Sequence, residues 1–116
     1  MKVSFSSRPG RDCTVVAVHG VLDLSTEPEF RQSLEQAVAS GARRVVIDLT
    51  DVPIMDSSAL GALVVMYKAM RERGGSLCVA APQLVVRAVL TITSVDRVVT
   101  VYDTVEAAEE DVPAAT

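Results

Sequence analysis

Tryptophan is absent from this 116-residue chain, and all aromatic residues together make up only 3% of it. So few aromatic side chains do not build the stacking platform on which single-stranded nucleic acids bind. Basic charge does not accumulate either, since 11 lysines and arginines stand against 15 aspartates and glutamates and leave a net charge of −4. We therefore expect neither nucleic acid nor an anionic membrane as a partner.

Long apolar runs are also missing. The longest, from Ala59 to Tyr67, is far shorter than the roughly 20 residues that span a bilayer. The first residues, 1–4, lack the apolar centre of a signal peptide. The two cysteines, Cys13 and Cys78, do not have C-x-x-C spacing and are expected to be reduced and packed. These features predict a small cytoplasmic domain.

Motifs that carry common chemistry are absent as well. The chain has neither G-x-x-x-x-G-K-[ST] nor G-x-G-x-x-G, so nucleotide binding by those routes is unsupported. No set of His and Cys has metal-ligand spacing. The single histidine, His19, ends a predicted strand, and G-x-S-x-G is missing, so a hydrolase using Ser57 or Ser58 would need His19 within hydrogen-bond reach. We expect no cofactor, no metal and no enzymatic activity.

What the chain does have is hydrophobic residues at 49% of its length, enough for the core of one domain. Short alternating or continuous apolar runs predict strands, and apolar residues recurring every three or four positions predict helices. The predicted strands are 2–6, 14–19, 45–49, 76–80 and 98–101, and the predicted helices are 25–40, 57–73, 84–92 and a last one after Asp103. A turn is expected at 8–12, where Pro9 and Gly10 stand.

The resulting order is ββαβαβαβα. Strands alternate with helices after the opening hairpin, so the sheet is expected to be mixed and mostly parallel, with helices packed on it. This is an α/β fold. We assign residues 1–110 to one domain and 111–116 to a disordered acidic tail.

The stretch from Val45 to Met66 stands out for function. A buried strand ends near Leu49, a short loop follows, and Asp56-Ser57-Ser58 opens a helix. Ligands and modifications gather at such places, because helix N–H groups point outward at the carboxyl ends of parallel strands. Asp56 and Ser57 are both suited to cap the helix. If Ser57 is the cap, Ser58 is the first helical residue and its side chain is free.

This helix is apolar on two sides. At 100° per residue, the face assigned to the sheet consists of Leu60, Leu63, Val64, Tyr67 and Met70. The opposite stripe consists of Ser58, Ala62, Val65 and Ala69, where a surface helix would carry charges. Either neighbouring helices cover this stripe, or it is a docking face for a partner with a serine at its leading edge.

Asp23 follows the second predicted strand and is expected on the same rim as Asp56. Two carboxylates there could bind Mg²⁺, orient the substrate hydroxyl of a kinase, or bond to a basic group of a partner. The alternative is that Asp23 only caps the helix at 25–40.

Three segments now resemble a known family. Gly20-Val21-Leu22-Asp23, Val46-Ile47-Asp48-Leu49 and Met55-Asp56-Ser57-Ser58-Ala59-Leu60-Gly61 are similar to the STAS domain of bacterial anti-sigma factor antagonists. The similarity extends over nearly the whole chain, and the Asp-Ser-Ser-x-Leu-Gly element is quite specific in that setting.

The resemblance implies a role in transcription regulation under stress by partner switching. The unphosphorylated domain would bind an anti-sigma factor that is also a serine kinase, and so release the sigma factor. Phosphorylation of the residue matching Ser58 would end binding, and a phosphatase would restore it. The family's acidic positions map to Asp23 and Asp56, and the expected partner contacts are Asp23, Asp56, Ser57, Ala62, Val65 and Ala69.

One residue departs from the family pattern, because Ala59 stands where the family usually has glycine. A methyl group beside Ser58 could slow a kinase or change which kinase fits. The alternative is therefore a STAS scaffold or transporter-associated subunit that binds a protein partner without being phosphorylated. A response-regulator receiver would use Asp48 as phospho-acceptor, but the acidic pair and the lysine that it needs are missing.

Overall fold

The structure is a computed structural model that describes residues 3–110, so the tail expected at 111–116 lies outside the described residues. Its elements follow the predicted order, with one short 3₁₀ helix (η1) added. The strands are β1 (Ser4–Gly10), β2 (Cys13–His19), β3 (Arg44–Asp51), β4 (Ser76–Ala80) and β5 (Val101–Tyr102). The helices are α1 (Glu27–Ala39), α2 (Ser57–Glu72), α3 (Leu84–Ile92), η1 (Val95–Arg97) and α4 (Val105–Glu110).

The five strands form one sheet in the order β1-β2-β3-β4-β5. β1 pairs antiparallel with β2, and every other neighbouring pair is parallel. The predicted α/β class with a mixed, mostly parallel sheet is confirmed. Because β2, β3 and β4 run the same way, the loops that follow them lie at one edge of the sheet.

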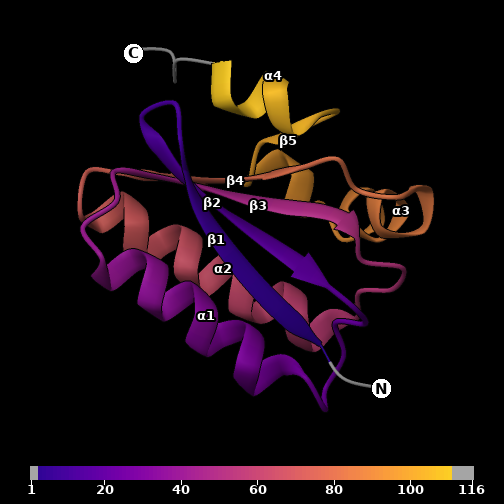
Figure 1. Ribbon diagram of the computed structural model, residues 1–116. Helices are drawn as coiled ribbons and strands as arrows, with labels where there is room; N and C mark the ends of the chain where they lie inside the picture. The colour runs from indigo at the N-terminus through magenta and orange to yellow at the C-terminus, as the bar shows by residue number, and fades with distance from the viewer. Residues whose placement is uncertain (1–2, 111–116) are drawn as a thin grey trace.

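Helices cover both faces of the sheet. α1 and α2 lie side by side on one face and α4 lies on the other (Figure 1). Val45 and Ile47 of β3 belong to the larger core beneath α1 and α2, whereas Val46 packs with Ala108 of α4 in a smaller one. The continuous apolar run of β3 therefore reflects a strand that is buried on both faces.

The opening hairpin is tighter than the sequence predicts. β1 continues through Pro9, which pairs with Thr14, and the turn is reduced to Arg11 and Asp12. An edge strand tolerates proline because one of its sides needs no N–H donors. Asp12 takes a φ of 55°, a left-handed conformation that aspartate tolerates in turns.

The strand expected at 98–101 is mostly not a strand. η1 occupies Val95–Arg97, Val99 is fully buried in the larger core, and β5 is limited to Val101–Tyr102. The apolar run that suggested a strand is therefore buried only in part, because Val98 is 48% exposed. Within residues 3–110 no helix combines the length and the apolar character needed to cross a membrane.

Gly75, after α2, and Gly61, within α2, give a matched test of how tightly the chain packs at each position. A Cβ at Gly75 would lie 2.5 Å from the carbonyl oxygen of Arg43 and 2.8 Å from Met70 Cε, whereas a Cβ at Gly61 meets nothing within 4 Å. Gly75→Ala is expected to lower the free energy of unfolding by roughly 1–3 kcal/mol through overpacking. Gly61→Ala, inside α2, is expected to raise it by roughly 0.5–1 kcal/mol. Urea denaturation measures both, and equal effects would contradict the packing described.

Candidate functional site

Asp56 caps α2. Its backbone is extended, and its Oδ1 accepts hydrogen bonds from the N–H groups of Ser58 at 3.0 Å and Ala59 at 3.3 Å. The alternative in which Ser57 is the cap is therefore wrong: Ser57 is the first helical residue, and it is exposed. A carboxylate has the advantage over a hydroxyl here because the helix N-terminus favours negative charge.

The hydroxyl of Ser58 is not free, contrary to the expectation from the sequence. Ser58 Oγ donates a hydrogen bond of 2.5 Å to the same Oδ1 of Asp56, and the side chain is half-buried. One carboxylate oxygen thus accepts three hydrogen bonds from the first turn of α2. Ser58 is held in a defined position by the residue that caps its helix.

Asp23 closes the turn that leads into α1. Its Oδ1 accepts from Ser25 N at 3.0 Å, Ser25 Oγ at 2.7 Å and Thr26 N at 3.1 Å. Thr26 stands at the cap position, yet its hydroxyl donates to the Val21 carbonyl at 2.8 Å instead of capping. The interpretation of Asp23 as a residue that fixes the start of this helix is therefore supported by its contacts.

Asp56 also links the two loops. Its Oδ2 accepts a 3.1 Å hydrogen bond from the N–H of Leu24, the residue directly after Asp23. Leu22 donates its N–H to the Ile54 carbonyl, and Asp56 donates its own N–H to the Leu22 carbonyl. The expectation that Asp23 and Asp56 lie on the same rim is thus met by backbone pairing of their loops.

Both carboxylates are kept ionised. The hydroxyl of Ser58, followed by backbone N–H groups of Ala59, Ser58 and Leu24, lowers the pKa of Asp56. The hydroxyl of Ser25, with N–H groups of Thr26 and Ser25, lowers the pKa of Asp23. Hydrogen bonds to the charged form are the cause in each case, and burial opposes them.

The residues of the stripe predicted on α2 differ in how far they are exposed. Ala62 is buried, with 4% of its surface exposed, because α2 turns this side toward the core. Val65 is 56% exposed, and Ala69 is half-buried. The buried face is also rotated from the predicted one, since it includes Ala59 and Met66. Of the predicted stripe, Val65 is therefore the largely exposed apolar residue, and Ala62 belongs to the core.

Two exposed apolar residues beside this site were missed from the sequence. Leu24 is 75% exposed in the loop after β2, and Ile54 is 51% exposed in the loop after β3. Both lie within two residues of the carboxylates Asp23 and Asp56. The same loops also contain the buried residues Leu22, Val52 and Met55, so the sequence alone did not mark which of their apolar residues are exposed.

The contacts of His19 do not support a hydrolase. Its Nδ1 lies 2.9 Å from Asp51 Oδ2, and both side chains are exposed. Ser58 instead bonds to Asp56, so the contacts found among residues 3–110 join His19 to neither serine. The described residues also include no group of three or more His, Cys, Asp or Glu suited to a metal ion.

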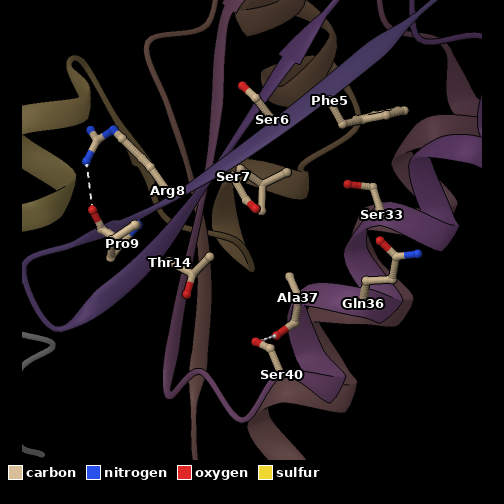
Figure 2. A pocket seen from close by; sticks show the side chains of 11 residues that line it. Phe5, Ser6, Ser7, Arg8, Pro9, Thr14, Ser33, Gln36, Ala37 and Ser40 are labelled. Atoms are coloured by element: carbon tan, nitrogen blue, oxygen red, sulfur yellow. Dashed lines mark hydrogen bonds between the residues drawn. The ribbon is translucent and has the colours of Figure 1, made fainter.

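A hollow of about 390 Å³ lies elsewhere, between β1 and α1. Figure 2 shows Phe5 and Ser7 of β1 facing Ser33, Gln36 and Ser40 of α1 across it. The Ser40 hydroxyl donates to the Ala37 carbonyl at 2.7 Å, so it is already used within α1. None of the predicted site residues lines this hollow.

The structure thus combines a mixed, mostly parallel sheet with a serine at its rim whose hydroxyl is held by the residue that caps its helix. Residues 7–108 match the STAS domain family, and the chain belongs to that family.

Individual relatives agree with this placement. An anti-sigma F factor antagonist of Paenibacillus polymyxa is 25% identical over 104 residues, which is 89% of each chain. The crystal structure of an anti-sigma factor antagonist from Mycobacterium paratuberculosis superposes with a TM-score of 0.86 at 25% identity, covering 95% of this chain and 96% of that one.

SpoIIAA, a Bacillus cell fate determinant, shares the fold in its unphosphorylated and phosphorylated forms. The TM-scores are 0.75 and 0.67, at 21% and 20% identity. Each match covers 90% of this chain, with 92% of the unphosphorylated and 96% of the phosphorylated chain.

Acid titration tests the role of Asp56. Its pKa is lowered from 3.8, so its ionised form stabilises the fold above that value, and this contribution is lost as pH falls below it. Asp56→Asn is therefore expected to lose less stability than the wild type between neutral pH and about pH 3. Denaturant unfolding at a series of pH values measures the difference, and parallel losses would contradict it. Asp23→Asn is expected to act in the same direction, because its pKa is lowered by the same kind of bonds.

Proposed function

We propose that this protein is an anti-sigma factor antagonist that works by partner switching in the cytoplasm. Its unphosphorylated form binds an anti-sigma factor that is also a serine kinase, and the sigma factor is released. Phosphorylation of Ser58 ends binding, and a separate phosphatase restores it. The domain itself catalyses nothing in this proposal. Its family membership and the names of its relatives support the assignment.

The observation that carries the proposal is the position of Ser58. It stands in the first turn of α2, half-buried, with its hydroxyl held by Asp56. Exposed apolar side chains border it in the two neighbouring loops and on α2, namely Leu24, Ile54 and Val65. In this proposal the partner covers these apolar groups and Ser58 together.

A phosphate on Ser58 would act first within the domain. Esterification removes the proton that Ser58 Oγ donates to Asp56 Oδ1, and it adds about −1.5 to −2 charges beside that carboxylate. At about 5 Å and an effective dielectric constant near 20, each pair of unit charges costs roughly 3 kcal/mol. Phosphate and carboxylate then compete for the same N–H groups of α2.

This competition reaches the neighbouring loop. The other oxygen of Asp56, Oδ2, accepts the N–H of Leu24. Displacing Asp56 would therefore loosen Leu24, which in this proposal contacts the partner. A partner carboxylate near Ser58 would add a repulsion of similar size, and 3 kcal/mol corresponds to roughly a hundredfold weaker binding. A local change of charge is therefore sufficient for a switch.

Ala59 does not oppose this proposal. Its side chain is fully buried, so the methyl group points into the core and adds no bulk to the exposed surface around Ser58. The expectation that Ala59 would hinder a kinase loses its steric basis. Alanine also favours a helix more than glycine does. In a helix interior the difference is roughly 1 kcal/mol.

Intact-mass spectrometry after incubation with ATP and candidate anti-sigma kinases tests the phosphorylation. The wild type is expected to gain one phosphate on Ser58, and Ser58→Ala to gain none while still binding the kinase. Ser57→Ala is the matched control: it removes an exposed neighbouring hydroxyl, and it is expected to be phosphorylated normally. One phosphate on Ser58→Ala would refute the assignment. A stable complex without phosphate would instead indicate the scaffold or transporter-associated alternative.

A charge at Val65 tests the docking face. Val65→Glu is expected to weaken binding to the anti-sigma factor at least about tenfold, because it buries a charge in an apolar contact. The free energy of unfolding should change by less than about 0.5 kcal/mol, since the position is exposed. Arg71→Glu, exposed about 120° around α2 from Val65, is the control and should bind normally. Unchanged affinity measured by titration calorimetry for Val65→Glu would exclude this face.

A further inference from the structure

The smaller core of the domain contains a thiol beneath a short helix. This core lies between the sheet and α4 and consists of Val15, Val46, Cys78 and Ala80 from the sheet and Ala108 from α4. Cys78 is buried, with 8% of its surface exposed, and it is not part of a disulfide. α4, which has six residues, lies on this side of the sheet (Figure 1). Access of solvent to Cys78 therefore depends on α4.

α4 contributes little apolar surface to this core. Ala108 is its one fully buried side chain, and Val105 is half-buried. On the other face of the sheet, α2 buries six side chains, including Leu60 and Leu63. Hydrophobic stabilisation grows with the apolar area removed from water, and an alanine side chain supplies the least of it. Apolar packing therefore holds α4 to the sheet far more weakly than it holds α2.

Polar contacts of Glu109 make up for this. Its two carboxylate oxygens accept from Arg8 Nη1 at 3.2 Å and Nη2 at 2.9 Å, and Oε1 also accepts from the N–H of Arg11 at 3.3 Å. A Cβ at Gly10 would clash with Glu109 Oε1, so the carboxylate packs directly against the hairpin backbone. One side chain thus joins α4 to the hairpin of β1 and β2.

Arg44 makes the second attachment, and it acts on the backbone of α4. Its Nη2 donates to the Ala108 carbonyl at 2.7 Å and its Nη1 to the Glu109 carbonyl at 3.5 Å. The last carbonyls of a helix lack partners within the helix, and an arginine side chain supplies them here. Because these bonds do not involve the carboxylate, a change of the Glu109 side chain leaves them in place.

We propose that α4 is a detachable cover of Cys78 and that the carboxylate of Glu109 keeps it closed. An element with few buried apolar contacts opens at a lower free energy than the whole domain. When α4 opens, water replaces Arg8 and Arg11 as partners of Glu109, and Cys78 becomes accessible from the side that α4 leaves. α1 and α2 pack on the other face (Figure 1), so the opening is independent of the proposed switch at Ser58.

Alkylation by iodoacetamide measures the opening, and peptide mapping separates Cys78 from Cys13. The thiolate of Cys78 displaces iodide from the reagent, and the thiol proton passes to the buffer. The rate, relative to that in urea-unfolded protein, is expected to depend only weakly on urea below the unfolding midpoint, because opening α4 exposes little surface. A urea dependence as steep as that of equilibrium unfolding would show that α4 does not open separately, and would overturn the proposal.

The neighbouring residue of β4 provides a matched control. Val79 is fully buried in the larger core, on the opposite side of the strand from Cys78. In a Cys78→Ala background, Val79→Cys is expected to react only through unfolding of the whole domain, with the full urea dependence. Alkylation of Val79→Cys as fast as that of Cys78, with the same weak urea dependence, would mean that opening is not confined to α4.

Substitution of Glu109 tests its role in closure. Glu109→Gln is expected to raise the alkylation rate of Cys78 at least about tenfold, because charge-assisted hydrogen bonds to Arg8 and Arg11 are lost. Glu110→Gln removes the adjacent, exposed carboxylate and is expected to react like the wild type. An unchanged rate in Glu109→Gln, or an equal rise in both variants, would refute the assignment of Glu109.

Discussion

The carboxylate of Asp56 is the interaction on which the functional edge of this domain depends. One oxygen accepts two N–H groups and a hydroxyl from the start of α2, and the other accepts the N–H of Leu24 from the neighbouring loop. The same group therefore sets where the helix begins, where Ser58 points and how two loops meet. Removing its charge would affect all three at once, although Asp56 is only partly buried.

The sheet explains why these groups meet at all. β2 and β3 are parallel neighbours, so the loops after them emerge at one edge, and an isolated bridge between Leu22 and Met55 continues their pairing beyond the strands. Because β3 is buried on both faces, it cannot shift its register without exposing valine or isoleucine. The sheet thus holds exposed loop residues in place along one edge. Binding residues commonly lie in loops that a stable scaffold positions in this way.

A structural feature could be predicted from the sequence where neighbouring residues alone determine it. Strand and helix order follow from periodicity, and the bounds of β4 and α3 agree with it to the residue. The cap of α2 was ambiguous because Asp56 and Ser57 are both suitable, and the contact of Asp56 with Leu24 is not visible in the sequence. The helical wheel predicts Ala62 on the surface because its buried face is rotated by about one residue from the observed one. Alanine does not reveal this error, because it is small and uncharged and occurs at buried and exposed positions alike.

The same local arrangement determines what a modification can do. In the proposed switch, a phosphate at Ser58 lies close to N–H groups that already donate hydrogen bonds to Asp56. Asp23 likewise accepts hydrogen bonds from the N–H groups of its own turn. Neither carboxylate can withdraw without leaving donors unpaired, so the added charge is opposed inside the domain as well as at the partner. The core beneath needs no rearrangement, because the groups in competition lie at the rim and α2 becomes buried only from Ala59 and Leu60 onward. A binding surface can thus be changed while the sheet that supports it stays as it is.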